Sequence, residues 1–267
     1  MLDGKRLLIT GLATPESIAF ATAQAAVSLG ARVVLTAFPR DLDSAREVAA
    51  TLDRSIEVLP LDLCDIEAVD SVSAHLGDRL GGLDGALHAV AFAPAAALGG
   101  DLLATPPADI ELAFRTSAWT LASLARIVRT LAPPGGSSLV GLDFEARDGA
   151  WPVYNWMGVC KAALRSTSRY LARDLGRARI RVNLVAAGPI ETRAGRGIPG
   201  FDQLLDAWAT TSPLPWCTDD PSPVADTVCF LLSDLARAIT GEVVHVDGGY
   251  HAMSAPLSPR FDEEVCP

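Results

Sequence analysis

Lysine is almost missing from this chain. It occurs only at Lys5 and Lys161, whereas lysine and arginine together number 22. Aspartate and glutamate number 32, so the net charge is −10 at pH 7, which argues against nucleic acid or an anionic membrane surface as a partner. Hydrophobic runs long enough to cross a membrane are also missing, because glycine, proline or charge interrupts each of them. The amino terminus passes straight into an apolar stretch, so we expect no signal peptide.

Cysteine is sparse and follows no pattern. The five cysteines are scattered and form no CxxC pair, and the four histidines show no metal-ligand spacing. The sequence therefore predicts free thiols in a reducing cytoplasm, with neither a zinc site nor a disulfide framework.

What the chain has in quantity is apolar sequence in short alternating runs. Its 267 residues are 49% hydrophobic, enough to bury one large core. Strands are predicted at 5–10, 31–36, 55–60, 83–90, 136–142, 179–186 and 243–246, and helices at 17–29, 41–52, 65–80, 109–131, 154–175, 201–210 and 222–236. This alternation predicts an α/β fold, a doubly wound (Rossmann) seven-stranded parallel sheet in a single domain. The domain is placed at 1–250, with a substrate lid at 193–220 and an irregular tail at 251–267.

The turn after the first predicted strand lies where a doubly wound fold binds phosphate, beyond the carboxyl end of the strand. Of the pattern G-x-G-x-x-G only Gly11 is present, and Ser17 and Ala19 stand where the other glycines could be. Ser17 can donate its hydroxyl and backbone N–H to a phosphate or simply cap the following helix, and the two roles are compatible. The loop therefore indicates a nucleotide site mainly through its place in the order of elements.

The next strand ends carry further candidates. The second predicted strand ends without an acidic residue to hold ribose hydroxyls. Phe38 can stack under an adenine, and Arg40 can stack as well or meet a 2′-phosphate, which leaves NADH and NADPH open. After the third strand, Asp62 can accept from an adenine amine or cap the next helix. Residues 89–94 form a small, apolar turn that either lets a backbone approach a cofactor or packs a crossover.

The stretch WPVYNWMGVCK, residues 151–161, carries the chemistry. Pro152 favours the first turn of a helix, so Tyr154 and Lys161 are predicted to share one helix. At 3.6 residues per turn the two side chains return to nearly one face, about 10 Å apart along the axis, with Gly158 leaving a gap between them. A phenol there can donate to an oxygen that gains charge while an ammonium holds a neighbouring hydroxyl. The alternative is an ordinary amphipathic helix with a solvated lysine, but a chain that otherwise uses arginine favours a specific role for Lys161.

These features belong to a resemblance that covers nearly the whole chain. It is carried by LDGKRLLITG, LTAFPR, HAVAFAP, DFEARDGAWPVYNWMGVCKAAL, RYLARDLG, RVNLVAAGPIET and LLSDLARAITGEVVHVDGG, from about residue 2 to 250. In these stretches the chain resembles the NADH-dependent enoyl-acyl-carrier-protein reductases of the short-chain dehydrogenase/reductase superfamily. The Tyr-x6-Lys pair and the YNWMG run are nearest the branch that contains long-chain, mycolate-pathway enoyl reductases.

The resemblance implies an oxidoreductase of type II fatty-acid biosynthesis, a part of lipid metabolism. Hydride would pass from NADH, or alternatively NADPH, to the β-carbon of a 2-enoyl thioester on an acyl carrier protein. Tyr154 would hydrogen-bond the thioester oxygen as enolate charge builds, and Lys161 would hold the nicotinamide ribose. Phe144 would lie near the nicotinamide and substrate, with plain core packing as its alternative. The implied dinucleotide contacts are Gly11, Ser17, Ile18, Phe38, Arg40, Asp62, Leu63, Val90, Ala91, Lys161, Ile190 and Thr192. The implied acyl-pocket residues are Tyr154, Leu98, Trp156, Met157, Ala187, Pro189 and Trp208.

The chain departs from this family in two places. Ala89 and Ala91 stand where relatives usually carry Ser and Gly, so we expect weaker NADH binding. The segment between Thr192 and Trp208 is shorter than in long-chain relatives, which suggests shorter acyl substrates.

Partners follow from the same resemblance. An acyl carrier protein is acidic, so Arg193 and Arg196 beside the lid are candidates for docking it, with ordinary solvated arginines as the alternative. The family resemblance also implies a homotetramer in the cytoplasm.

Other functions have less support. A ketone or alcohol dehydrogenase of this fold uses Ser and Tyr-x3-Lys, but Met157 stands four residues before Lys161 and Gly141 thirteen before Tyr154. A paralogous reductase of specialised metabolism would suit the two alanines after the fourth strand. A catalytically silent, cofactor-sensing protein is disfavoured because Tyr154 and Lys161 are both intact.

Overall fold

The computed structural model describes residues 1–144 and 149–256. Within these residues one parallel sheet of seven strands has the order β3-β2-β1-β4-β5-β6-β7. The strands are β1 (Arg6–Ile9), β2 (Arg32–Ala37), β3 (Glu57–Pro60), β4 (Gly85–His88), β5 (Ser137–Phe144), β6 (Ile180–Ala187) and β7 (Val243–Val246). The chain runs outward from β1 to β3 and then returns to place β4 on the other side of β1, which is the switch point of a doubly wound sheet. The predicted fold class is confirmed.

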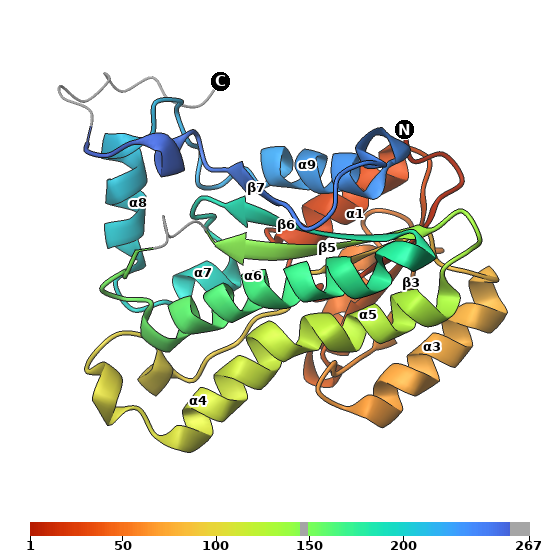
Figure 1. Cartoon of the computed structure of the whole chain (residues 1–267), viewed down its shortest axis with the longest axis horizontal. Helices are drawn as coiled ribbons and strands as arrows, with labels where there is room; N and C mark the ends of the chain where they lie inside the picture. The colour runs from red at the N-terminus through yellow and green to blue at the C-terminus, as the bar shows by residue number, and fades with distance from the viewer. Residues whose placement is uncertain (145–148, 257–267) are drawn as a thin grey trace.

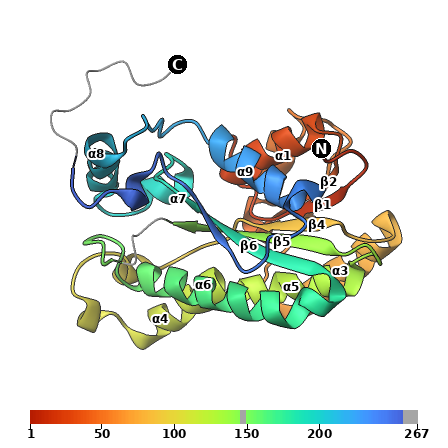
Figure 2. The same cartoon turned by 45° about the horizontal axis from the view of Figure 1, so that its top comes forward.

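Helices cover both faces of this sheet (Figures 1 and 2). The α1 and α9 helices pack together on one face, while α3, α5 and α6 pack on the other. The α-helices are α1 (Ile18–Ser28), α2 (Leu42–Ala49), α3 (Ile66–Leu80), α4 (Pro107–Phe114), α5 (Thr120–Leu131), α6 (Asn155–Leu175), α7 (Arg193–Arg196), α8 (Phe201–Thr211) and α9 (Ser222–Leu232). Short η segments lie at Pro39–Asp41, Ala95–Ala97, Leu102–Ala104, Arg115–Trp119, Gly176–Ala178, Asp234–Ala236 and Tyr250–Ala252.

The strands are apolar on both sides because both faces of the sheet are covered. In β1, Leu7 and Ile9 join the core beneath α1 and α9, and Leu8 joins the core beneath α3 and α5. All three side chains are fully buried. This two-sided burial is why short uninterrupted apolar runs, rather than alternating ones, mark the strands in the sequence.

Local capping fixes several helix ends where the sequence predicts them. The Ser17 hydroxyl accepts a hydrogen bond from the Phe20 backbone N–H at 3.2 Å and so begins α1. The Asp65 carboxylate caps α3, and Gly81 ends that helix at φ +67°, a conformation that glycine adopts without strain.

The predicted continuous helix at 109–131 is wrong in its middle. A π-helical turn over Arg115–Trp119 separates α4 from α5. At this turn the Ser117 hydroxyl donates to the Phe92 carbonyl oxygen at 2.8 Å and accepts from the Phe92 N–H at 2.9 Å. The extra residue in the turn lets the helix bind the loop after β4, a tertiary contact that the local pattern cannot show.

The predicted start of α6 is also wrong. Pro152 lies in a turn before the helix, and Tyr154 is the N-cap residue rather than a residue inside it. The helix begins at Asn155, which has φ +35° and whose side-chain amide donates to the Gly99 carbonyl oxygen at 2.7 Å. The loop at 99–100 therefore anchors the start of α6, where the sequence suggested proline alone.

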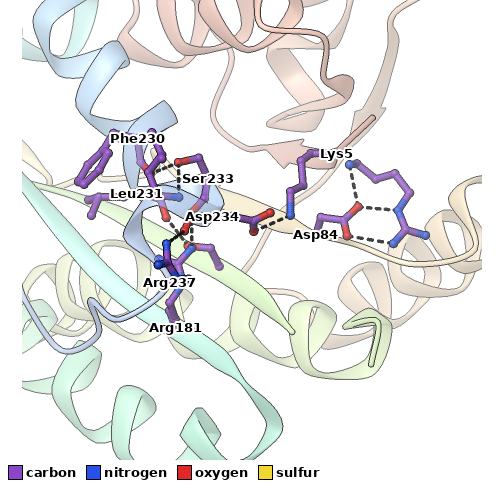
Figure 3. A network of polar contacts seen from close by, with 11 residues as sticks. Lys5, Asp84, Arg181, Phe230, Leu231, Ser233, Asp234 and Arg237 are labelled. Atoms are coloured by element: carbon purple, nitrogen blue, oxygen red, sulfur yellow. Dashed lines mark hydrogen bonds and ion pairs between the residues drawn. The ribbon is translucent and has the colours of Figure 1, made fainter. Parts of the chain in front are cut away.

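The amino-terminal ends of the strands carry a polar network (Figure 3). The Lys5 ammonium pairs with Asp234 at 2.8 Å, which joins β1 to the segment after α9. The Arg6 guanidinium donates to both carboxylate oxygens of Asp84, at 2.7 and 3.1 Å. This network lies at the opposite end of the strands from their carboxyl ends, where the candidate site described below is located.

Two expectations about the whole chain need qualification. Cys64, Cys160 and Cys229 are free thiols, but Cys217 is disulfide-bonded, so the prediction of free thiols is wrong at that position. Most of the predicted tail at 251–267 lies outside the described residues, since these end at 256, and its first residues complete a short 3-10 turn. No helix in the described part of the chain is long and apolar enough to cross a membrane.

Candidate functional site

The carboxyl ends of the central strands meet at one edge of the sheet. The Thr10 hydroxyl, after β1, donates to the Leu87 carbonyl oxygen of β4 at 2.9 Å and accepts from the Ala89 N–H at 3.3 Å. Phe144 at the end of β5 is in register with Ala187 at the end of β6. The loops that follow these strands therefore surround a common space, the usual ligand position in this architecture.

Gly11 is the closest point between the first loop and the turn after β4. Its φ is +79°, and a Cβ atom there would lie 2.2 Å from the Ala89 carbonyl oxygen. Only glycine fits this approach. In the same loop Ser17 donates its hydroxyl to the Thr14 carbonyl oxygen at 2.7 Å.

Tyr154 stands at the start of α6 and is 6% exposed. Its ring lies 4.9 Å from the Phe144 ring, centroid to centroid, so two of the predicted catalytic residues are in contact. Burial raises the pKa of the Tyr154 phenol far above its ordinary value of 10, and the charge of Asp143 raises it further. The phenol therefore keeps its proton at neutral pH and can act as a hydrogen-bond donor.

Gly158, one turn into α6, lies beside this phenol. A Cβ atom at Gly158 would lie 3.7 Å from a ring carbon of Tyr154. An alanine side chain there would make ordinary van der Waals contact with the ring, and the gap at Gly158 stays a prediction.

Lys161 is buried on α6 with 8% of its surface exposed. Its Nζ donates to the Leu142 carbonyl oxygen of β5 at 2.9 Å. Burial lowers the pKa of Lys161, while the negative charge of Asp143 opposes that shift. An ammonium has three donors, so Lys161 can hold a ligand hydroxyl as well as the strand.

An ion pair that the sequence analysis missed lies behind these residues. The side chain of Asp143 is completely buried and pairs with the Arg165 guanidinium, which also donates to the Phe144 carbonyl oxygen at 3.2 Å. The Asp143 Oδ1 atom has no hydrogen-bond partner. Asp143 directly follows the carbonyl that Lys161 binds, so an acidic residue at the end of β5 was the available signal.

His88 is a second buried polar residue that the sequence analysis did not single out. Its Nε2 lies 2.9 Å from the Thr120 Oγ1, and that hydroxyl donates to the Thr116 carbonyl oxygen at 2.6 Å. The Thr120 proton is therefore committed, and Nε2 must carry the histidine proton. Burial lowers the pKa of His88 from 6.5 to about 3, and the charge of Lys161 lowers it further.

An apolar cluster surrounds the phenol. Its buried members include Ala97, Tyr154, Met157 and Cys160, and its partly buried members include Leu98, Phe144, Trp151 and Trp156. The Trp156 indole N–H donates to the Leu102 carbonyl oxygen at 3.1 Å. The cluster brings together four predicted acyl-pocket residues: Tyr154, Leu98, Trp156 and Met157.

Comparison with known proteins identifies the family. The family model described as "Enoyl-(Acyl carrier protein) reductase" matches residues 11–251. A protein of Mycolicibacterium smegmatis named enoyl-acyl-carrier-protein reductase (NADH) is 40% identical over 93% of this chain and 97% of its own length. Relatives of the same name from Bacillus subtilis and Neisseria meningitidis are 37% and 39% identical, over 94% and 93% of this chain and 97% and 95% of their own lengths. The chain belongs to the enoyl-acyl-carrier-protein reductase family.

In this member of the reductase family the predicted dinucleotide residues lie along the same carboxyl edge but in different surroundings. Phe38 is 43% exposed, and the Arg40 guanidinium lies 4.9 Å from the centre of its ring. The Asp62 carboxylate accepts from the Cys64 N–H at 2.8 Å, within its own loop. Leu63 is buried beneath α3, and Val90 packs partly against that core.

The remaining dinucleotide candidates lie on the first and last loops of the edge. Ile18 packs at the start of α1 and Ala91 is exposed. Ile190 is buried, and the Thr192 hydroxyl accepts from the Gly195 N–H at 3.0 Å to begin α7.

The last three predicted acyl-pocket residues are placed less uniformly. Trp208 is buried against Phe144 with ring centroids 5.7 Å apart. Ala187 packs into the core on the α1 and α9 face, and the Pro189 carbonyl oxygen accepts from the Trp216 indole at 2.8 Å. Only Trp208 of these three joins the aromatic side chains beside the phenol.

The two candidate docking arginines already have acidic partners in the chain. Arg193 pairs with Asp41 at 3.1 Å and Arg196 with Glu191 at 3.6 Å. Both side chains are more than half exposed, so each pair is weak and open to exchange.

Proposed function

We propose that this chain reduces the carbon–carbon double bond of a 2-enoyl thioester carried by an acyl carrier protein, with NADH as the reductant. One observation carries the proposal: the buried phenol of Tyr154, a hydrogen-bond donor at neutral pH, stands at the start of the helix that also holds the buried ammonium of Lys161. A protonated donor is required where negative charge builds on the thioester oxygen.

The residues at the carboxyl edge fit a dinucleotide. The Gly11 backbone has no room for a Cβ atom, as in a loop that approaches a phosphate closely. We propose that Gly11, Ser17, Ile18, Phe38, Arg40, Asp62, Leu63, Val90, Ala91, Lys161, Ile190 and Thr192 hold NADH. When bound, NADH supplies the hydride that reaches the β-carbon of the enoyl group.

The protein's own residues then stabilise charge and fix position. The Tyr154 phenol donates a hydrogen bond to the thioester oxygen, which gains negative charge as the double bond is reduced. The Lys161 ammonium, already fixed to the Leu142 carbonyl oxygen, uses its remaining donors on the ribose hydroxyls. Phe144, Leu98, Trp156, Met157, Ala187, Pro189 and Trp208 enclose the acyl group in this proposal.

The geometry gives ketone reduction less support. A Cβ atom at Gly141 would lie 2.7 Å from a methyl group of Leu184, so a serine there would not fit without repacking. Met157 has no proton to donate in place of a second acid. A reductase of specialised metabolism, acting on an unusual enoyl group, uses the same site and remains the second candidate because of Ala89 and Ala91.

A single assay tests the proposal. NADH oxidation is followed at the absorbance of its nicotinamide with crotonyl thioester, with a β-ketoacyl thioester, and with NADPH in place of NADH. We expect oxidation with crotonyl thioester and NADH alone. Turnover of the β-ketoacyl thioester but not the enoyl thioester would refute the proposal.

We further propose a cytoplasmic homotetramer. Apolar side chains that are 36–59% exposed lie on neighbouring helices α4, η4 and α6: Phe114, Trp119, Val159 and Tyr170. Exposed apolar side chains on adjoining helices fit a second copy of the chain. Val159→Arg should lower the mass measured by light scattering, whereas Leu235→Arg, on an exposed leucine after α9, should leave it unchanged. A monomeric wild-type protein would contradict the proposal.

A further inference from the structure

Trp208 packs with two other aromatic rings beside the site, and those two rings also contact each other at 6.1 Å. The ring of Tyr250 stacks on Trp208 at 3.7 Å with an interplanar angle of 10°, and the ring of Trp151 lies 5.7 Å from Trp208 with an angle of 26°. Phe144 contacts Trp208 at 5.7 Å and Tyr154 at 4.9 Å. We call Trp151, Trp208 and Tyr250 the aromatic stack. It is joined through Phe144 to the catalytic phenol.

The Trp208 ring is held in place by the backbone at Asp247 and Gly188. The Trp208 indole N–H donates to the Asp247 carbonyl oxygen at 3.2 Å, and a Cβ atom at Gly188 would lie 2.6 Å from the same indole nitrogen. The buried Asp247 carboxylate in turn accepts from the Gly249 N–H at 3.0 Å and the His251 N–H at 2.8 Å. The turn that carries Tyr250 is therefore fixed by the same residue that anchors Trp208.

The space between the start of α6 and α8 is filled as well. Val153, Phe201 and Leu204 form a buried cluster against which Phe144, Trp151 and Ile198 pack. An acyl chain that leaves the thioester near Tyr154 and extends toward α8 meets the face of this packed layer. Moving Trp208 aside would break three ring contacts and an indole hydrogen bond at once.

We propose that the aromatic stack is the specificity-determining wall of the acyl pocket and restricts the enzyme to short 2-enoyl thioesters. The inference rests on the proposed function. It deepens that proposal by assigning chain-length selection to Trp151 and Tyr250, two residues outside the acyl pocket that the family resemblance implies.

The test compares kcat/KM for crotonyl and trans-2-dodecenoyl thioesters of coenzyme A with NADH. The wild-type enzyme should favour crotonyl thioester. Tyr250→Ala and Trp151→Leu each remove one ring of the stack and should raise the dodecenoyl-to-crotonyl ratio at least tenfold. Tyr250→Phe keeps the ring and is the matched control, for which we expect an unchanged ratio.

The outcomes separate the two proposals. A wild-type enzyme that reduces neither thioester overturns the proposed function. A wild-type enzyme that reduces both but prefers dodecenoyl thioester, or an unchanged ratio in folded Tyr250→Ala and Trp151→Leu, overturns the wall alone. If both variants fail to fold by circular dichroism, inhibition of the wild-type enzyme by saturated thioesters decides: dodecanoyl thioester binding more tightly than butyryl thioester overturns the inference, and weaker binding supports it.

Discussion

The Nζ atom of Lys161 donates a hydrogen bond to the Leu142 carbonyl oxygen at 2.9 Å. This bond ties α6 to β5 one residue before Asp143 and two before Phe144. The strand that carries the aromatic neighbour of Tyr154 is thereby fixed to the helix that Tyr154 precedes as its N-cap residue. The spacing of the phenol and the ammonium is consequently a property of the sheet as well as of the helix.

Removing the Tyr154 hydroxyl should slow the reaction without affecting cofactor binding. Tyr154→Phe keeps the ring against Phe144 but loses the donor to the thioester oxygen. Loss of one such donor lowers kcat about a hundredfold or more in other enzymes, and we expect the same here. Steady-state kinetics with crotonyl thioester measure the effect, and an NADH titration by fluorescence provides the control. Full activity in the variant would refute the assigned role.

Replacing Lys161 should weaken NADH binding more than it affects folding. Methionine has nearly the length of lysine and no charge, and burial disfavours the ammonium, as its lowered pKa indicates. We expect Lys161→Met to raise the Kd for NADH at least tenfold while the free energy of unfolding stays constant or increases. Calorimetric titration and urea denaturation test the two parts separately. Unchanged NADH affinity would contradict the proposed ribose contact.

Neutralising Asp143 should destabilise the fold and lower the pKa of Lys161 further. Asp143→Asn removes a buried negative charge that the largely buried Arg165 guanidinium pairs with, which we expect to cost about 2–4 kcal/mol. Asp174→Asn is the matched control, because Asp174 pairs with Arg173 on the exposed end of α6 and should contribute nothing measurable. Urea denaturation of both variants gives the comparison. Equal stability of the two would show that the buried pair has no special weight.

His88 should make the protein less stable as the pH falls. The pKa of His88 is about 3 in the fold and near 6.5 when unfolded, so below pH 6.5 the unfolded state takes up a proton that the folded state does not. The contribution of His88 to the free energy of unfolding is fully present above pH 6.5 and is lost progressively as the pH falls to about 3. Between pH 7 and pH 5 this group alone should lower the free energy of unfolding by about 2 kcal/mol.

The variant His88→Gln isolates that contribution. Glutamine retains a donor for Thr120 but does not titrate. The free energy of unfolding of the variant should therefore fall less steeply over the same pH range. Urea denaturation at pH 7, 6 and 5 measures both proteins. Parallel pH profiles would mean that His88 is not responsible.

Adding a methyl group at Gly11 should damage the proposed phosphate loop. The Cβ of Gly11→Ala would meet the Ala89 carbonyl oxygen and must push the loop away from β4, so we expect weaker NADH binding together with lower stability. Gly4→Ala is a matched control, since Gly4 has a similar φ of +69° but open space around its Cβ position. Both alanines are strained by the positive φ, so comparing the NADH affinities of the two variants cancels that shared effect and leaves the effect of the contact with Ala89. Equal NADH affinities of the two variants would contradict the proposed role of this loop in cofactor binding.

The sequence predicts the sheet well because each strand is buried on both faces and reads as a short apolar run. Helix ends are predicted where the capping group is local, as at Ser17 and Asp65. The predictions of helix ends are wrong where a contact with a residue distant in the sequence sets the end. The start of α6 depends on Asn155 reaching Gly99, and the π turn depends on Ser117 bonding Phe92, contacts that hydrophobic periodicity cannot encode.

The same distinction between local and long-range contacts applies to the candidate site. The family is confirmed by the comparisons, and Tyr154, Phe144 and Met157 lie in one apolar cluster. The Asp143–Arg165 pair and the aromatic stack were missed, because their members come from separate elements and acquire meaning only when the chain folds. The individual roles of the site residues stay predictions until the variants above are measured.

The position of Tyr154 at the N-cap of α6 has a consequence for any activity that survives without its hydroxyl. The peptide dipoles of this 21-residue helix sum to a partial positive charge at that end, next to the place where the thioester oxygen becomes anionic. The backbone would therefore continue to favour that anion after the phenol is gone. The residual rate of the phenylalanine variant, and its sensitivity to ionic strength, would measure what the macrodipole alone provides.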